Sequence, residues 1–371
     1  MKKQQKRADI NRKKVFFGPK IGICKNMFAD AIRDENYEYC SYGEDRRSRL
    51  KELLISKKII SVLPRFLKRF VYRYVFGYSF LKEKRAAEYS FLFSNGYELY
   101  GDRASFLLFL DYLKKDFKNC KLAIHLYDAV QTDDIRAFFL QYRHYFDTIL
   151  TFNRYDADEL GIEYYGPVSE CGVIEPQGES EESDLFFSGR ADLTRADLTI
   201  ETFKYLSDNG KKCVFFVHFQ NTREIIPEFF RRLCDHLGVN VPLAKNLCVE
   251  YKRSKFYFDT YIPYARTLSY LLKTKAFLEI ILLPEGRASC TSRLAQAMAY
   301  KRKLLTNSEI TKEEPYYNDH NIFTFSKPED IDLRFFDTDF QEIEKSFSTV
   351  DLLKYMEQRS FGNVAGQDTK A

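Results

Sequence analysis

The sequence predicts an α/β protein built from two domains with mainly parallel sheets. Apolar segments of strand length alternate with segments of helical periodicity, and most of the apolar segments end in a polar loop. The 371 residues exceed what one hydrophobic core usually carries. A stretch rich in Gly, Pro, Ser and Glu, at 167–184, separates the two alternating halves and is the predicted linker.

Composition narrows the class of protein. Hydrophobic residues make up 45% of the chain, and the net charge of +5 is too small to argue for nucleic-acid binding. The eight cysteines show no C-x-x-C spacing, which predicts free thiols, mostly buried, in a reducing compartment. No apolar run reaches the ~18 residues that span a bilayer, and the basic start lacks the apolar core of a secretory signal. We therefore expect a cytoplasmic protein that binds no nucleic acid.

The first domain is expected over 14–166, after a basic tail at 1–13 that is expected to be disordered. A short strand at 15–17 leads into a turn made by Gly18 and Gly22. Further elements alternate as in a doubly wound sheet, with strands predicted at 89–93, 121–127, 147–152 and 163–165 and a helix at 102–117.

Two side chains near the end of the strand at 121–127 are candidates for a general base. Asp128 follows the strand directly, where the carboxyl ends of parallel strands commonly meet a ligand. His125 lies inside the strand and, by alternation, on the opposite face. A histidine inside a strand more often belongs to the core, so Asp128 is the preferred candidate and His125 the second.

A basic amphipathic segment interrupts the first domain at 46–85. It mixes Leu, Ile, Phe and Tyr with many Lys and Arg, and it has no acidic residue between Lys57 and Leu81. Pro64 kinks or restarts its helical pattern. Such a segment is typical of reversible binding to an anionic membrane surface. The alternative, a domain helix with a solvated basic face, fits the pattern equally well.

The second domain is expected over 185–330, followed by a helical segment at 331–361 and a disordered tail at 362–371. A strand at 185–187 is followed by Gly189 and Arg190, and the helix at 194–208 contains Arg195. The next strand, 213–217, ends at His218, and another helix opens at Tyr264. This is how a Rossmann-like domain begins.

One stretch of the second domain carries the strongest site signal. An apolar strand is predicted at 277–283, a loop containing Glu285 follows, and a helix at 291–303 leads to a strand at 304–306. Thr291, Ser292 and Arg293 open that helix. Free N–H groups, two hydroxyls and a guanidinium at a helix start suit a phosphate or diphosphate. The alternative is that Arg293 pairs with Glu279 or Glu285 and serves the structure.

The same stretch resembles the carboxyl-terminal domain of GT-B-fold glycosyltransferases, in particular those of lipopolysaccharide and capsule biosynthesis. The matching segments are Thr-Ser-Arg at 291–293, Gln-Ala-Met at 296–298, Lys-Leu-Leu-Thr-Asn at 303–307, Tyr-Asn at 317–318 and Asn-Ile-Phe at 321–323. The final strands of the first half, 122–165, resemble the amino-terminal domain of these enzymes. Gln296 and Asn153 depart from the pattern, which has Glu and Asp there.

The resemblance implies two Rossmann-like domains facing a cleft, one for the acceptor and one for the donor. It implies transfer of a sugar from a nucleotide-activated donor to a glycan or glycolipid acceptor at the inner face of the cell membrane. Donor-binding residues would then be Gly189, Arg190, Arg195, His218, Tyr264, Glu285, Thr291, Ser292 and Arg293. No cofactor and no metal are expected, because no Asp-x-Asp follows a long apolar strand. The departures keep open a non-catalytic homologue that serves another transferase as a binding or chaperone subunit.

Overall fold

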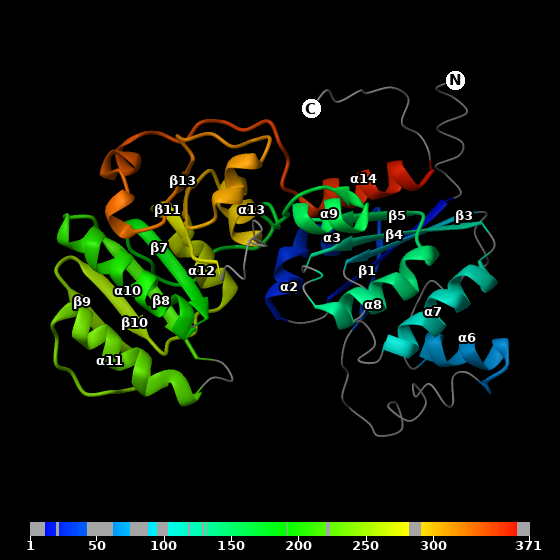
Figure 1. Ribbon diagram of the computed structural model, residues 1–371. Helices are drawn as coiled ribbons and strands as arrows, with labels where there is room; N and C mark the ends of the chain where they lie inside the picture. The colour runs from blue at the N-terminus through cyan, green and yellow to red at the C-terminus, as the bar shows by residue number, and fades with distance from the viewer. Residues whose placement is uncertain are drawn as a thin grey trace. The chain divides into compact units, whose positions relative to one another are not determined.

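The computed structural model describes residues 12–19, 22–42, 62–74, 88–94, 103–117, 119–127, 130, 132–190, 192–219, 223–281 and 291–361. The chain divides into two compact units, Met1–Glu170 with Ser348–Ala371, and Cys171–Phe347. Each unit contains one sheet with helices on both faces (Figure 1). The predicted α/β class with two Rossmann-like parallel sheets is confirmed.

The first unit contains a six-stranded sheet whose paired strands are all parallel. The strands are β1 (Arg12–Pro19), β2 (Glu38–Tyr42), β3 (Glu88–Ser94), β4 (Cys120–Leu126), β5 (Thr148–Thr151) and β6 (Glu163–Tyr164). Their order is β2-β1-β3-β4-β5-β6, so the direction of strand addition reverses between β1 and β3. β3 and β4 are buried along almost their whole length because both faces of the sheet are covered.

Two layers of helices cover this sheet. They are α2 (Gly22–Met27), α3 (Ala29–Arg33), α6 (Arg65–Tyr74), α7 (Arg103–Asp116), α8 (Asp133–Tyr142), α9 (Arg154–Leu160) and α14 (Thr349–Phe361), with a 3-10 turn, η3 (Arg143–Tyr145). Alternation along β1 sends Phe17 into the core shared with α6, α7 and α8, and Phe16 into the core shared with α3 and α14. Both cores are rich in aromatic rings, as the composition suggested.

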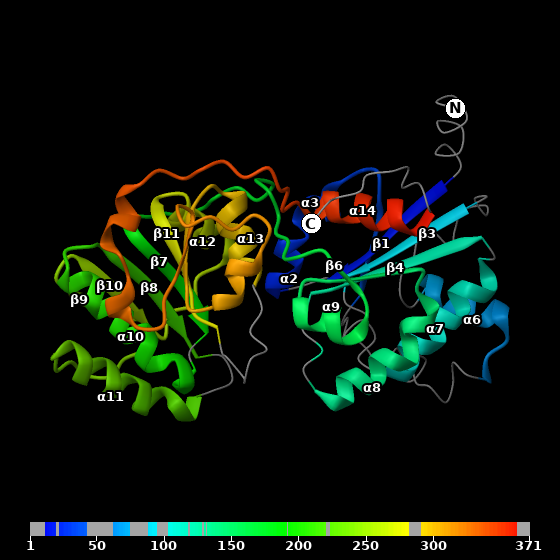
Figure 2. The same ribbon diagram turned by 45° about the horizontal axis from the view of Figure 1, so that its top comes forward.

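Helix α14 comes from the far end of the chain and packs against β3, β4 and β5 (Figures 1 and 2). Its start is held by Asp30 of α3, which is 7% exposed. The Asp30 carboxylate accepts hydrogen bonds from Ser348 Oγ at 2.8 Å, from Thr349 N at 3.1 Å and from the Thr349 hydroxyl. A carboxylate at a helix start satisfies free N–H groups and complements the helix dipole.

The second unit contains a seven-stranded sheet. Its strands are β7 (Ser183–Arg190), β8 (Cys213–His218), β9 (Leu247–Tyr251), β10 (Ser254–Phe258), β11 (Thr274–Glu279), β12 (Lys303–Thr306) and β13 (Ile322–Thr324). The order is β13-β12-β11-β7-β8-β10-β9, with only β9 antiparallel to its neighbour. The chain therefore starts at β7, runs outward to one edge, and returns to the other side of β7 as β11.

The helices of the second unit cover two cores, one on each face of the sheet. They are α10 (Leu193–Asp208), α11 (Ile226–Leu237), α12 (Tyr264–Leu271) and α13 (Ser292–Ala299), with 3-10 turns η4 (Arg223–Ile225), η5 (Glu309–Glu313), η6 (Pro328–Asp330) and η7 (Leu333–Asp337). One core lies under α10 and α11, and the other lies under α12 and α13. Asp192 caps the start of α10, and Gly210 with φ 78° follows its end.

Several predicted boundaries are wrong. Gly18 and Gly189 lie inside β1 and β7 rather than in the loops that follow them. β11 ends at Glu279, because its pairing with β12 stops there. The helix predicted at 291–303 ends at Ala299, because Lys301 adopts φ 53° and turns the chain into β12. The strands β2, β10 and β13 were not predicted from the sequence.

The cysteines and the basic segment are described only in part. Cys40, Cys120 and Cys213 are buried free thiols, whereas Cys171 and Cys248 are exposed, so the prediction of mostly buried cysteines fails at these two positions. Of the basic segment at 46–85 the structure describes residues 62–74, and the tail at 362–371 lies outside the described residues. β1 begins at Arg12, two residues inside the stretch expected to be disordered. Within the described parts, no helix is long and apolar enough to cross a membrane.

Candidate functional site

The candidate site lies where the strand order of the second unit reverses, between β7 and β11. The carboxyl ends of β7, β8, β11 and β12 meet at one edge of the sheet, and α10 and α13 begin there. Open α/β sheets bind ligands at this edge, in the crevice beside the reversal. Most of the predicted donor-binding residues are found on these elements.

Arg293 lies on the first turn of α13, and its guanidinium is packed between two aromatic rings. The guanidinium carbon lies 5.4 Å from the ring centre of Phe187 on β7 and 5.3 Å from that of Phe277 on β11. Its Nη1 nitrogen is buried and has no hydrogen-bond acceptor among the described residues. Burial lowers the pKa of Arg293 to about 10, so the side chain stays charged at neutral pH. Arg293 is therefore a buried cation, unlike the solvated arginine that is usual at a helix start.

Glu279, the last residue of β11, forms hydrogen bonds with both the start of α13 and the end of β12. It is 1% exposed and accepts hydrogen bonds from the Thr291 hydroxyl and, at 2.9 Å, from Thr306 Oγ1. Thr291 in turn caps α13 by accepting the backbone N–H of Arg293 at 3.1 Å. Burial raises the pKa of Glu279, and the two hydroxyls and Arg293 act in the opposite direction. The carboxylate thus positions the start of α13.

A glycine is required beside this cluster. A Cβ atom on Gly189 would lie 2.6 Å from the ring of Phe187 and 3.2 Å from Nη2 of Arg293. The first distance is far below any ordinary contact between carbon atoms, so a side chain there would displace the ring on which Arg293 packs. Gly189 therefore serves the close approach of β7 to α13.

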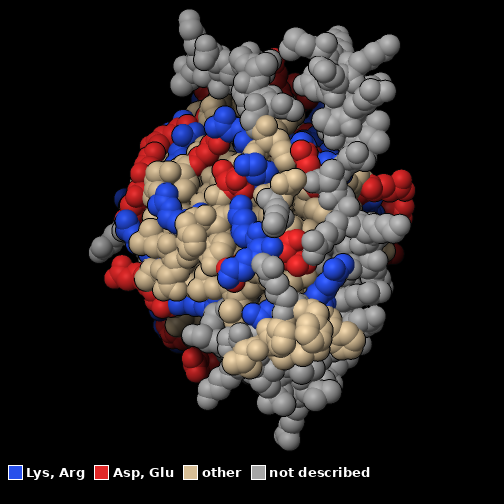
Figure 3. Space-filling view, turned by 90° about the vertical axis from the view of Figure 1, so that its right-hand side faces the viewer, with Lys and Arg blue, Asp and Glu red and all other residues tan. Residues whose placement is uncertain are grey.

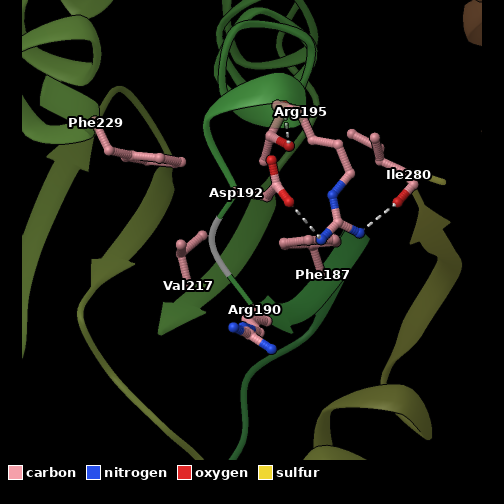
Figure 4. Close-up of a pocket in the computed structure, with 8 residues that line it drawn as sticks. Phe187, Arg190, Asp192, Arg195, Val217, Phe229 and Ile280 are labelled. Atoms are coloured by element: carbon pink, nitrogen blue, oxygen red, sulfur yellow. Dashed lines mark hydrogen bonds and ion pairs between the residues drawn. The ribbon is translucent and has the colours of Figure 1, made fainter. Parts of the chain in front are cut away.

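Arg195, on the first turn of α10, is occupied by the protein itself. Its Nη1 donates to the carbonyl oxygen of Ile280 at 3.1 Å, and its Nη2 lies 4.0 Å from the Asp192 carboxylate (Figure 4). These contacts join the start of α10 to the chain just after β11. They leave Arg195 at the wall of a small hollow rather than free to clamp a ligand.

That hollow is lined by Phe187, Arg190, Asp192, Arg195, Thr199, Val217, Phe229 and Ile280. Figure 4 shows apolar side chains at its walls, with Arg190 and Arg195 coming from the end of β7 and the start of α10. The space within it, about 240 Å³, includes open solvent, so its enclosed part is smaller still. A whole nucleotide sugar would therefore extend beyond it.

Arg190 and His218 lie side by side at the ends of β7 and β8. Arg190 is exposed and forms no ion pair among the described residues. Burial, followed by the charges of Arg293 and Arg190, lowers the pKa of His218, while its hydrogen bond to the Gly189 backbone and the carboxylate of Asp259 act in the opposite direction. Burial is thus the largest cause of the lowered pKa, and the two arginine charges add to it.

The remaining predicted residues lie elsewhere or outside the described residues. Tyr264 starts α12 and packs against the core under α12 and α13. His125 on β4 is 1% exposed, and its ring centre lies 6.3 Å from that of Tyr165. Asp128 and Glu285 lie outside the described residues. Ser292 is the first residue of α13, beside Arg293.

Two motif residues have roles that the sequence did not reveal. Asn307 exchanges two hydrogen bonds with the backbone of Ile281, at 2.7 and 3.1 Å, and so continues the edge of β11. Asn321, which is completely buried, does the same with the backbone of Gln341, at 2.7 and 2.8 Å. Both asparagines belong to the segments that carry the resemblance, so part of that pattern serves the structure. Among the described residues no group of three or more His, Cys, Asp or Glu side chains could hold a metal ion.

No protein-family model and no curated protein sequence matches the chain. Similar solved structures include an α,α-trehalose-phosphate synthase (UDP-forming) from Burkholderia vietnamiensis, with a TM-score of 0.46 and 10% identity over 80% of this chain and 84% of that one. They also include the Glycosylation Associate Protein (Gap123) complex from Streptococcus agalactiae, with a TM-score of 0.45 and 11% identity over 82% of this chain and 59% of that one. At TM-scores below 0.5, these similarities say nothing about activity.

Proposed function

We propose that the protein is a GT-B-type glycosyltransferase that moves a sugar from a nucleotide-activated donor to a surface glycan, of the lipopolysaccharide or capsule class. The second unit would bind the donor and the first unit the acceptor. The acceptor would be carried on a lipid, which places the reaction in the cytoplasm at the inner face of the cell membrane. The sequence resemblance and the positive edge of the second sheet support this proposal.

The observation that carries the proposal is the gathering of three arginines where the strand order reverses. The charges of Arg190 and Arg293 each act on Arg195, and both act on His218. Asp192 offsets Arg195 and Glu279 offsets Arg293, yet Arg190 forms no ion pair among the described residues and Nη1 of Arg293 has no acceptor there. A bound anion would relieve this repulsion, and a diphosphate is the anion that a nucleotide sugar supplies.

The same residues suggest how the diphosphate leaving group would be stabilised. Arg190 and Arg293 would neutralise its charge, and the first N–H groups of α13, with Thr291 and Ser292, would add hydrogen-bond donors. Gly189 would let the backbone of β7 approach the phosphates, and Arg195 would hold the edge in place. This division of roles needs no metal ion. Glu285 would hold the donor ribose, and Tyr264 and His218 would contact the remainder of the donor.

The acceptor proton requires a base from the first unit if the reaction inverts the anomeric centre. Asp128 is the proposed base, because it comes two residues after the last residue of β4 in the sequence. His125 remains the second candidate. At 1% exposure its imidazole would have to become accessible before an acceptor could reach it.

The second candidate function is a non-catalytic subunit that binds or chaperones another transferase. Gln296 favours it. This residue stands where the resembling enzymes place a ribose-binding Glu, and it is only 7% exposed on α13, with Nε2 unpaired among the described residues. A buried amide cannot accept hydrogen bonds from the ribose hydroxyls as the carboxylate of that Glu would.

Two measurements separate these functions. We expect UDP, GDP or ADP to raise the melting temperature of the full chain, because a ligand that binds the native state stabilises it. Hydrolysis of the matching nucleotide sugar, slow in the absence of acceptor, would then identify an enzyme. Binding without hydrolysis or transfer would identify the binding subunit, and no binding of any nucleoside diphosphate would refute the donor site.

A further inference from the structure

Helix α6 in the first unit is apolar on two opposite faces, whereas a surface helix of a soluble protein usually buries one. On its inward face Tyr72 is 1% exposed, and its ring centre lies 5.0 Å from that of Phe109 on α7. On its outward face Phe66 and Phe70 are 70% and 56% exposed, and Val62 just before the helix is 78% exposed. The outward face is therefore an apolar surface that the described part of the protein does not cover.

This apolar surface, formed by Val62, Phe66, Leu67 and Phe70, is the main concentration of its kind in the described part of the chain. The other large apolar side chains that are exposed there, such as Leu140 and Leu243, lie singly on separate segments. Scattered apolar residues need no partner, but a contiguous cluster marks a surface that another body contacts.

The charged residues of this segment of the sequence all have one sign. Lys68 and Arg69 lie on α6 itself, and the sequence contains no acidic residue from Lys58 to Phe80. Figure 3 views the molecule from the side of α6 and shows an uncharged patch low in the view with Lys and Arg side chains next to it. A partner that covers both the apolar and the basic residues must present apolar groups together with negative charge.

We propose that the outward face of α6 rests on the surface of an anionic lipid bilayer. Phe66 and Phe70 enter the boundary between headgroups and acyl chains, and the basic residues that precede them in the sequence of α6 contact lipid phosphates. The ten residues of α6 span about 15 Å, half the thickness of the hydrocarbon core, so the helix lies on the membrane rather than across it.

A second copy of the chain is a poorer occupant of this surface. A symmetric contact would place the same basic residues against each other, and like charges at an interface oppose association. A bilayer containing anionic lipid has the opposite charge and the apolar interior that the phenylalanines require. This inference does not depend on sugar transfer, because a binding subunit could occupy the same membrane surface.

Flotation of the full-length protein with vesicles tests the proposal. We expect binding to vesicles with about one-third phosphatidylglycerol at low salt, weaker binding at high salt, and little binding to pure phosphatidylcholine. The double variant Phe66→Ser/Phe70→Ser should bind about tenfold more weakly or worse, since most of the inserted apolar surface is gone. The matched variant Leu140→Ser/Leu243→Ser, which removes exposed leucines elsewhere, should bind like the wild type.

Three results would overturn the proposal. These are failure of the wild type to bind anionic vesicles at low salt, equal loss in both double variants, and full binding by Phe66→Ser/Phe70→Ser. Sedimentation identifies the rival occupant: a wild-type dimer that becomes a monomer in Phe66→Ser/Phe70→Ser assigns the surface to a second copy. Melting curves verify that the variants fold. Nucleoside-diphosphate binding, measured in parallel, should be unchanged, so failure here leaves the donor site a separate question.

Discussion

The guanidinium carbon of Arg293 lies 5.3 Å from the ring centre of Phe277, on the strand that precedes its own helix. This contact fastens the start of α13 to β11, and the ring of Phe187 closes the other side at 5.4 Å. The same side chain keeps a buried Nη1 without an acceptor among the described residues. Arg293 therefore stabilises the βαβ unit and also has hydrogen-bonding capacity left for an anion.

Replacement of Arg293 by alanine should reduce both stability and ligand binding. Loss of two cation–π contacts beside the buried Glu279 should lower the free energy of unfolding by about 2 kcal/mol. The dissociation constant for a nucleoside diphosphate should rise about tenfold or more, because one charge-assisted contact is worth roughly 1.5–3 kcal/mol. Urea denaturation and calorimetric titration of the folded variant measure the two effects. Unchanged affinity would assign Arg293 to structure alone.

Replacement of Arg190 by alanine should separate binding from stability. Arg190 is exposed and has no ion pair among the described residues, so the free energy of unfolding should change by less than about 0.5 kcal/mol. Affinity for the nucleoside diphosphate should still fall by roughly tenfold, and Arg190→Lys should restore only part of it. Calorimetric titration measures the affinity, and a variant that binds like the wild type would move the diphosphate away from the tip of β7.

Glu279→Gln should change how stability depends on pH. Burial raises the pKa of Glu279 above its ordinary value of 4.5, so the native state binds this proton more tightly than the unfolded chain does. The corresponding stability is present below pH 4.5 and is lost as the pH rises through the folded pKa. The Glu279→Gln variant has no carboxyl group to titrate at this position, so it does not lose this stability. Its free energy of unfolding relative to that of the wild type should therefore rise with pH, by up to about 1.4 kcal/mol per pH unit between pH 4.5 and the folded pKa of Glu279. Urea denaturation across this range measures it, with the exposed Glu201→Gln as control; parallel curves would contradict the prediction.

Asp30→Ala should loosen the attachment of α14. The carboxylate is buried and accepts hydrogen bonds from Ser348 and Thr349 at the start of the helix. Their loss should lower the free energy of unfolding by about 2 kcal/mol and speed proteolysis near residue 348. Asp34→Ala is a suitable control, because Asp34 accepts from Asn36 in an exposed turn. Equal stability of the two variants would show that the cap contributes little.

Most strands could be predicted from the sequence, including the edge strand β6, but β2, β10 and β13 could not. β7 and β8 each contain a continuous apolar run, at 185–187 and 213–217, because helices cover both faces of the sheet, and Asp192 and Gly210 mark the ends of the helix between them. Neither β2 nor β13 contains an apolar run of ordinary strand length, and both exist because they pair with β1 and β12. β10 follows β9 through a turn at Lys252, with φ 54°, where the sequence offers no glycine.

The positions of the arginines at the site could be predicted, but their surroundings could not. A helix start after a strand predicts that Thr291 and Arg293 meet the end of β7 at a common edge. The end of β11 is set by pairing with β12, which is a long-range effect, so Glu279 was expected inside a strand and its bonds to Thr291 and Thr306 were not foreseen. Likewise, only the fold reveals that Phe187 and Phe277 enclose the guanidinium.

The last prediction concerns protonation of His218. Burial and the charges of Arg293 and Arg190 lower its pKa below the ordinary value of 6.5, so the neutral imidazole is the native form at neutral pH. The stability that this contributes is present above pH 6.5 and is lost as the pH falls through the folded pKa. Below pH 6.5 the wild type should therefore lose stability relative to His218→Gln.

A bound diphosphate should reverse this shift. Its negative charge would stabilise the imidazolium against Arg190 and Arg293, so binding should take up a proton near pH 6. Calorimetric titration in two buffers with different heats of ionisation gives the number of protons taken up. Subtracting the value for His218→Gln removes the contribution of the nucleotide itself. A difference of zero between the two proteins would show that His218 does not sense the anion, and the diphosphate would then have to lie away from the end of β8.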